Sequence, residues 1–263
     1  MKQLLFILIG CALLLQGCKE NPKKKQTAET TTEDTSLFTK TVLKIIPIEH
    51  ATLVLEWNDT TIYIDPVGGP EPFEEQNEPD LILITDVHGD HLSVDTLVDL
   101  PTENSKIIVP QAVADLLPET FTAQVHILNN DDSTEQDGIT IEAIPMYNLR
   151  EEALKFHTKG RGNGYVLNVG DKRLYFSGDT EDIPEMRNLK NIDKAFICMN
   201  LPYTMTVESA AEAVLEFQPK QVYPYHYRGK PDIGDVAKFE SLVKASNQEI
   251  EVVQLDWYPN DDF

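Results

Sequence analysis

Cysteine is scarce in this chain, with three among 263 residues. Cys11 and Cys18 lie within and just after an apolar N-terminal run, so only Cys198 lies in the remainder of the chain. If that run is removed and Cys18 is modified, as argued below, no internal disulfide can form, even in an exported protein. Cys198 follows the apolar residues Ala-Phe-Ile, where a small buried residue is expected.

Positive charge is also scarce. Lys and Arg number 22 against 44 Asp and Glu, which gives a formal net charge of -22. Proteins that bind DNA or RNA gain much of their affinity from Lys and Arg contacts to phosphates. The charge balance therefore argues against a nucleic-acid partner, but it does not exclude a metal, which acidic side chains help to bind.

The chain also lacks an apolar run long enough to span a bilayer, which needs ~20 residues. The run Leu4–Leu15 follows one positive charge and leads to Leu-Gln-Gly-Cys, the layout of a signal peptide. This ending resembles the lipobox of bacterial lipoproteins. The resemblance implies that residues 1–17 are a signal peptide and that Cys18 carries a lipid. The chain would then be anchored to a membrane of the cell envelope, facing the periplasm or the cell surface. An ordinary secretory signal with an incidental cysteine is the alternative.

Residues 18–37 contain almost nothing apolar, and include three consecutive lysines and a run of threonines. Such a segment cannot bury enough surface to offset the entropy cost of ordering, so it is predicted to be a disordered tether. Residues 38–263 form the expected folded domain.

Two batches of strand patterns alternate with helical patterns in this domain, which predicts helices covering two packed sheets, an α/β (α+β) fold. Strands are expected at 41–48, 51–57, 60–64, 80–85, 107–109, 124–128, 138–146, 164–169, 172–177, 194–199, 221–225 and 250–255. Helices are expected at 93–100, 112–117, 184–189, 206–217 and 235–245.

Potential metal ligands follow the ends of several predicted strands. The segment Asp86-Val-His88-Gly-Asp90-His91 places four of them within six residues, directly after the strand at 80–85. Imidazole suits zinc, copper, iron and nickel, and carboxylate suits harder ions. Three more candidates stand elsewhere: Asp179 and His226 just past later strands, and His157 in a polar loop.

These segments resemble, in order, the motifs of the metallo-β-lactamase superfamily, whose fold is a four-layer αββα sandwich. The matching segments are Ile64-Asp65-Pro66, Thr85 to His91, His157, Gly178-Asp179-Thr180 and His226, within a resemblance that spans roughly Val42 to Leu255. The nearest likeness is to the branch that contains the L-ascorbate-6-phosphate lactonase and the phospholipase D that acts on N-acylethanolamine phospholipids.

The resemblance implies a site with two divalent metal ions, zinc being expected first, and a water or hydroxide between them as the nucleophile. Asp65 would support the ligands through hydrogen bonds, and Asp90 and Asp179 would be the catalytic residues, with Asp90 accepting the nucleophile's proton. Carried over by position, the ligands of the first metal would be Asp86, His88 and His157, those of the second Asp90, His91 and His226, and Asp179 would bridge the two.

Asp86 departs from the pattern, because the superfamily usually has histidine at this position. A carboxylate there would favour Mn, Fe or another hard ion, and it would weaken the ion's effect on its water. The alternative is that Asp86 does not reach the metal and that the first site is weak or empty.

Further candidates have structural alternatives. His50, in a His-Ala-Thr element similar to one in this branch, is expected at the edge of the site or as a hydrogen-bonding structural residue, and His126 as structural. Lys159 and Arg161 would bind a substrate carboxylate or phosphate, or would be solvated loop charges. Asn200 and Tyr203 are expected to line the pocket or to pack.

The sequence therefore predicts a metal-dependent hydrolase that cleaves an ester, lactone, amide or phosphodiester bond of a small molecule. No Gly-x-Ser-x-Gly, Cys-x-x-Cys or phosphate-binding loop offers a competing site. The alternative is a non-catalytic metal-binding lipoprotein that acts as an interaction module.

Overall fold

The computed structural model describes residues 43–259. The expected signal peptide, the lipidated Cys18 and the tether lie outside these residues. Within them, no helix is both long enough and apolar enough to cross a membrane.

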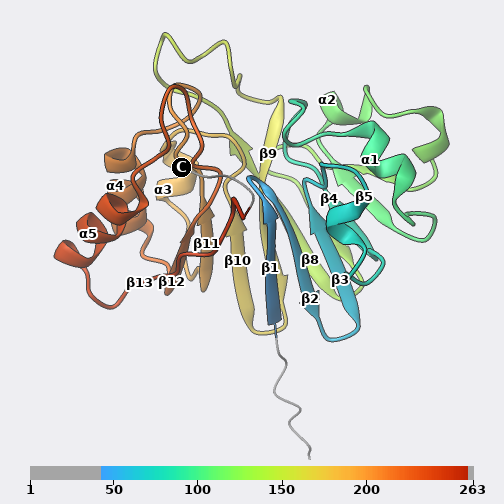
Figure 1. Cartoon of the computed structure of the whole chain (residues 1–263), viewed down its shortest axis with the longest axis horizontal. Helices are drawn as coiled ribbons and strands as arrows, with labels where there is room; N and C mark the ends of the chain where they lie inside the picture. Colours follow the sequence, from blue (N-terminus) through green and yellow to red (C-terminus); the bar gives the residue numbers. More distant parts are fainter. Residues whose placement is uncertain (1–42, 260–263) are drawn as a thin grey trace, which may run out of the picture. The chain divides into compact units, whose positions relative to one another are not determined.

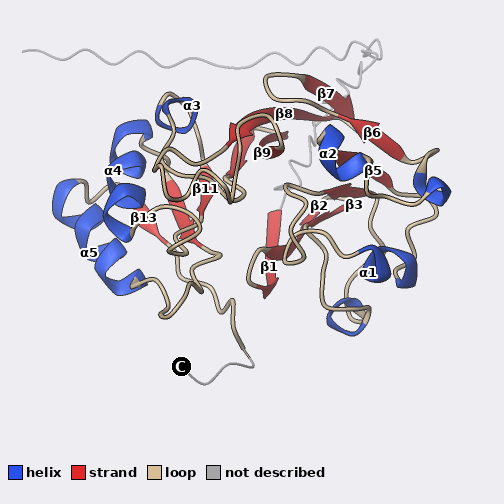
Figure 2. Ribbon diagram, turned by 90° about the horizontal axis from the view of Figure 1, so that it is seen from above, coloured by secondary structure: helices blue, strands red, loops and turns tan. Residues whose placement is uncertain are grey.

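Two sheets form the centre of the described domain, and helices lie on their outer sides (Figures 1 and 2). In spatial order the first sheet contains β1 (Leu43–Glu49), β2 (Thr52–Trp57), β3 (Thr60–Ile64), β4 (Leu81–Leu83), β5 (Lys106–Val109) and β6 (Val125–Ile127). The second contains β13 (Glu251–Val252), β12 (Gln221–Pro224), β11 (Lys194–Ile197), β10 (Lys172–Phe176), β9 (Gly162–Val169), β8 (Ile139–Met146) and β7 (Ser133–Gln136).

The helices divide between the two outer faces. Figure 2 shows α1 (Val94–Asp99) and α2 (Gln111–Ala114) on the side of the first sheet. It shows α3 (Pro184–Arg187), α4 (Val207–Phe217) and α5 (Val236–Ser246) on the side of the second. Two short 3-10 turns, Glu71–Phe73 and Glu119–Phe121, complete the set. The expected αββα sandwich is confirmed.

The alternation of side chains along the strands explains the layers. In β2, the side chains of Leu53 and Leu55 join the cluster that contains Ile139 and Ile141 of the opposing sheet. Val54, between them, joins a second cluster with residues of α1 and α2. A strand that is buried on both faces needs apolar residues at every position, which is why these strands have continuous apolar sequences.

Most of the expected elements are present, and the differences have local causes. The helices α1 and α4 begin where Ser93 and Thr206 accept hydrogen bonds from the backbone N–H groups of Thr96 and Ser209, as N-caps do. The strand β7, with the polar sequence Ser-Thr-Glu-Gln, was not expected, because an exposed edge strand has no apolar alternation. The elements β13, α2 and α3 are shorter than expected.

Candidate metal centre

The predicted ligands follow the ends of strands in both sheets and converge at one edge. In the first sheet β3 and β4 are parallel, and Asp65 and Asp86 come after them. In the second, β10, β11 and β12 are parallel, and Asp179 and His226 follow β10 and β12. Asp65 and His226 have positive φ angles of 46° and 45°, which are rare for residues other than glycine. Such conformations persist where the surroundings enforce them, and they are frequent at functional sites.

The first group of possible ligands contains Asp86, His88 and His157. Asp86 Oδ2 lies 2.7 Å from His88 Nδ1 and 3.9 Å from His157 Nε2. Asp86 and His157 are buried, whereas the side chain of His88 is 42% exposed. These are the three residues that the family resemblance assigns to the first metal.

A second group contains His91, Asp179 and His226, all buried. The Nε2 atoms of His91 and His226 are only 3.1 Å apart. Asp179 Oδ1 lies 3.2 Å from His226 Nε2, and Asp179 Oδ2 lies 3.5 Å from His91 Nε2 and 3.2 Å from His157 Nε2. Asp179 therefore contacts histidines of both groups, as a bridging ligand would.

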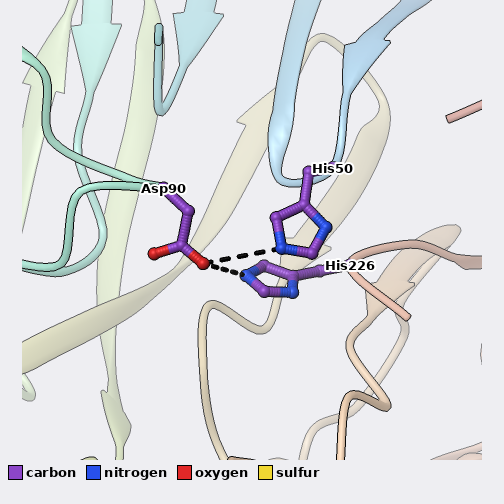
Figure 3. A group of neighbouring side chains, drawn as sticks. All are labelled: His50, Asp90 and His226. Carbon is purple, nitrogen blue, oxygen red and sulfur yellow. Dashed lines mark ion pairs between the residues drawn. The ribbon is translucent and has the colours of Figure 1, made fainter. Parts of the chain in front are cut away.

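His50 lies closer to this centre than its sequence context indicates. It forms a third group with Asp90 and His226 (Figure 3), and Asp90 Oδ2 is 3.5 Å from the Nε2 atoms of both histidines. Its ring lies 3.7 Å from that of His226, and its Nδ1 is 2.8 Å from the Tyr258 hydroxyl. The His-Ala-Thr element was the signal for His50, but it did not indicate which residues His50 would meet.

Hydrogen bonds on the far side of two rings determine which nitrogen faces the centre. The buried Asp65 accepts from His91 Nδ1 at 2.8 Å, and it is held in turn by the Thr85 backbone N–H at 2.7 Å and the Thr85 hydroxyl at 2.6 Å. His157 Nδ1 donates to the Tyr203 carbonyl at 3.2 Å. In both rings Nε2 is left for the centre. Such partners fix the tautomer and orientation of metal-binding histidines.

The electrostatics of the centre favour bound positive charge. Burial raises the pKa of Asp179, but the charges of His226 and His91 outweigh it and hold the pKa well below its usual value. Burial lowers the pKa of His91, yet Asp179 and Asp65 raise it well above its usual value. Burial and the charge of His226 lower the pKa of His50 to about 4. The carboxylates that raise the pKa of His91 in this way also attract a divalent cation.

The residues fit a metal by their unsatisfied atoms as well as by their chemistry. Among the described residues, His157 Nε2 and Asp179 Oδ1 are buried without a hydrogen-bond partner. Buried polar atoms are rarely left unpaired in proteins. Two imidazole Nε2 atoms 3.1 Å apart, those of His91 and His226, also suit a shared cation. The donor set is nitrogen and carboxylate oxygen, which zinc, manganese and iron accept.

A cavity of about 440 Å³ opens onto this centre. Its walls combine ligand candidates with an aromatic pair, Phe156 and Tyr203, whose rings lie 5.0 Å apart. Asn200, also expected to line the pocket, does so. Phe156 and the segment Arg228–Lys230 line the cavity as well, and sequence reasoning missed them, although the segment closely follows His226. The full lining is His50, His88, Asp90, Phe156, His157, Asp179, Asn200, Tyr203, Arg228, Gly229 and Lys230.

Lys159 and Arg161 are not in this lining. The Lys159 ammonium lies 2.6 Å from Glu185 and 4.6 Å from the centre of the Tyr147 ring. The Arg161 guanidinium binds Asp86. His126 lies exposed in β6 and is in none of the three groups.

Comparisons with known proteins agree with this geometry. The family model described as "Beta-lactamase superfamily domain" matches residues 44–226. A UPF0173 metal-dependent hydrolase of Pyrococcus horikoshii is 30% identical over 212 residues, which cover 77% of this chain and 92% of that protein.

Solved structures extend the likeness. The crystal structure of a metal-dependent hydrolase from Parabacteroides distasonis has a TM-score of 0.72 and 36% identity, and the match covers 81% of this chain and 92% of that one. A metallo hydrolase from Ignicoccus hospitalis shares the fold, with a TM-score of 0.68 at 24% identity, over 81% of this chain and 95% of that one.

Proposed function

Because the chain belongs to the beta-lactamase superfamily and is similar to metal-dependent hydrolases, we propose that it hydrolyses a small molecule with two divalent metal ions. The bond would be an ester, lactone, amide or phosphodiester, and zinc is the first candidate for the metal. The observation that carries this proposal is the convergence of histidine and aspartate atoms from both sheets on one cavity. Among the described residues, His157 Nε2 and Asp179 Oδ1 are buried there without a hydrogen-bond partner, and their contacts are ion pairs within the centre.

The position of each residue in the centre indicates the role that we propose for it. Bound divalent cations would supply a water activated as a nucleophile and would polarise the oxygen of the scissile group. His88, His157 and Asp86 would hold the first ion. His91, His226, Asp90 and His50 surround the second position, and Asp179 lies between the two. The side chain of Asp90 is 44% exposed and lines the cavity, so its carboxylate is placed to accept a proton from the attacking water.

The other residues that line the cavity indicate which kind of substrate it would accept. Phe156 and Tyr203 provide an apolar surface, while Arg228 and Lys230 provide positive charge on a protein that is otherwise strongly acidic. Arg228 also lies 3.1 Å from Glu49. A small molecule with an apolar body and an anionic group matches these walls, and both parts fit within about 440 Å³.

A screen of the metal-loaded protein on lactones, phosphodiesters and β-lactams tests the proposed activity. Asp179→Ala should abolish any turnover that is found, because it removes the carboxylate between the two ligand groups. Asp171→Ala is the matched control, since that carboxylate is 82% exposed and lies in a hairpin turn. Turnover of no substrate class, with a cellular phenotype that survives Asp179→Ala, would favour the non-catalytic interaction module instead.

We also propose that the chain is an exported lipoprotein. The support is the apolar run Leu4–Leu15 followed by Leu-Gln-Gly-Cys18. Mass spectrometry of the mature N-terminus should find a lipid on Cys18 as the first residue. An unmodified N-terminus downstream of Cys18 would refute this proposal.

A further inference from the structure

Asp86, the residue that departs from the superfamily pattern, is paired with an arginine. Arg161 Nε lies 3.1 Å from Asp86 Oδ1, and Arg161 Nη2 lies 3.0 Å from Asp86 Oδ2, so the guanidinium binds the carboxylate with two parallel hydrogen bonds. This bidentate geometry is the strongest form of the arginine–carboxylate pair.

The arrangement leaves Asp86 Oδ2 pointing at the centre. Besides Arg161, this oxygen faces His88 Nδ1 at 2.7 Å and His157 Nε2 at 3.9 Å. Arg161 is itself held by the Phe156 carbonyl, which accepts from Nη2 at 2.6 Å. Asp86 is fully buried, and the side chain of Arg161 is 22% exposed. The guanidinium therefore contacts both carboxylate oxygens, while the histidines face Oδ2.

Among the described residues, no other carboxylate of the centre has an arginine partner. Within the part of the chain that the structure describes, the ion pairs of Asp65, Asp90 and Asp179 are all with histidines. Arginine stays charged under all ordinary conditions, so its effect on Asp86 does not depend on pH. At position 86 the superfamily motif usually has a histidine, which is neutral when it binds a metal. Here the negative Asp86 carboxylate stands at that position, together with the permanently positive Arg161 guanidinium.

We propose that Asp86 and Arg161 act as one charge-balanced ligand unit, in which Asp86 Oδ2 binds the first metal ion and Arg161 cancels the carboxylate's charge. The inference rests on the proposed function only in assuming a cation beside Asp86, His88 and His157. Arg161 acts through Asp86 and is a positioning residue. Together the Asp86 carboxylate and the Arg161 guanidinium have a net charge of zero, like a neutral imidazole. Asp86 therefore favours hard cations less strongly than an unpaired carboxylate would.

Removal of the Arg161 charge should increase the affinity of the first site for a divalent cation. A guanidinium beside the ligand repels a divalent cation, and in a partly buried site that repulsion is several-fold larger than in water. Without it, the buried carboxylate has no fixed cation in the metal-free protein, which further favours metal binding. Arg161→Met should therefore bind the first ion more tightly, with the larger gain for a hard ion such as Mn²⁺ than for Zn²⁺.

Competition with a chelator, together with metal content per chain, measures this without any substrate. We expect Arg161→Met to lower the dissociation constant for Mn²⁺ by about tenfold or more. Arg161→Lys, which keeps the charge but not the bidentate geometry, should remain near wild type. Lys190→Met removes one exposed charge elsewhere, from a lysine outside every ligand group, and should change nothing. An unchanged or weaker affinity in Arg161→Met, or an equal gain in Lys190→Met, would overturn the proposal.

A second variant keeps the proposal testable if Arg161→Met does not fold without metal. Asp86→Asn keeps the shape of the side chain but removes its charge, so Arg161 is left to repel the ion. It should lose the first ion and retain the second, and two ions retained at wild-type affinity would show that Asp86 is not a ligand. Affinities that shift as expected without hydrolysis of any substrate would support the ligand unit and contradict the proposed activity. Hydrolysis of a substrate without those affinity shifts would support the proposed activity and contradict the ligand unit.

Discussion

The hydrogen bond from His91 to Asp65 makes a sharp prediction for Asp65→Asn. Asp65 is fully buried and accepts from His91 Nδ1 at 2.8 Å and from the Thr85 backbone and hydroxyl. An asparagine keeps the shape and still accepts from the Thr85 backbone N–H. Its amide group then faces His91 Nδ1 as a donor, so the imidazole proton moves to Nε2. That is the nitrogen that lies 3.1 Å from His226 Nε2 in the centre.

A protonated Nε2 cannot bind a metal, so Asp65→Asn should weaken the second metal position while leaving the fold intact. Loss of such a supporting hydrogen bond typically costs 10–100-fold in metal affinity, which corresponds to about 1.4–2.7 kcal/mol. Titration of the metal-free protein with Zn²⁺ in the presence of a competing chelator measures the change. Asp80→Asn is the control, because Asp80 accepts from the Thr61 backbone N–H outside the ligand groups. Wild-type affinity in Asp65→Asn would refute the tautomer argument.

Three further predictions concern other parts of the fold. Burial raises the pKa of Cys198 to about 12 from 9.0, so its thiol should resist alkylation at pH 9 until the protein unfolds. Because the unfolded thiol ionises first, wild type should lose more stability than Cys198→Ala between pH 9 and about 12, as measured by urea unfolding. Glu181→Ala should lower the free energy of unfolding by about 2–4 kcal/mol, since Glu181 accepts from Arg150 Nε and from two backbone N–H groups; a change below 1 kcal/mol would contradict this ~2–4 kcal/mol estimate. Gly229→Ala should displace the cavity wall, because a Cβ there would lie 2.0 Å from the Leu201 carbonyl oxygen. Its KM for any substrate found should rise more than kcat falls, and an unchanged KM would count against a role for this wall.

Patterns within the chain predicted the architecture well where local chemistry decides it. The strand pattern at 80–85 corresponds to β4, and the helical patterns at 93–100 and 206–217 correspond to α1 and α4. The polar strand β7 could not be found, because its residues pair with β8 through backbone hydrogen bonds that leave no side-chain pattern.

The candidate site was predictable as a set of residues but not as a set of contacts. Asp86 was identified from the ordered motifs, but its pair with Arg161, which lies 75 positions away, was not. Lys159 and Arg161 were expected to bind substrate or to be solvated loop charges, whereas the positive charges on the cavity wall belong to Arg228 and Lys230. Such partners are set by how the loops pack, and composition alone carries no information about that packing.

The division of the ligands between the two sheets has a consequence for stability. His50, Asp65 and the segment Asp86–His91 precede β7, and His157, Asp179 and His226 follow it. Each of the three ligand groups takes residues from both halves of the chain. A bound ion would therefore act as a cross-link between two halves that are remote in sequence, and its binding energy would add to the cohesion of the sandwich. The supply of metal would then affect the stability of the folded domain as well as its activity.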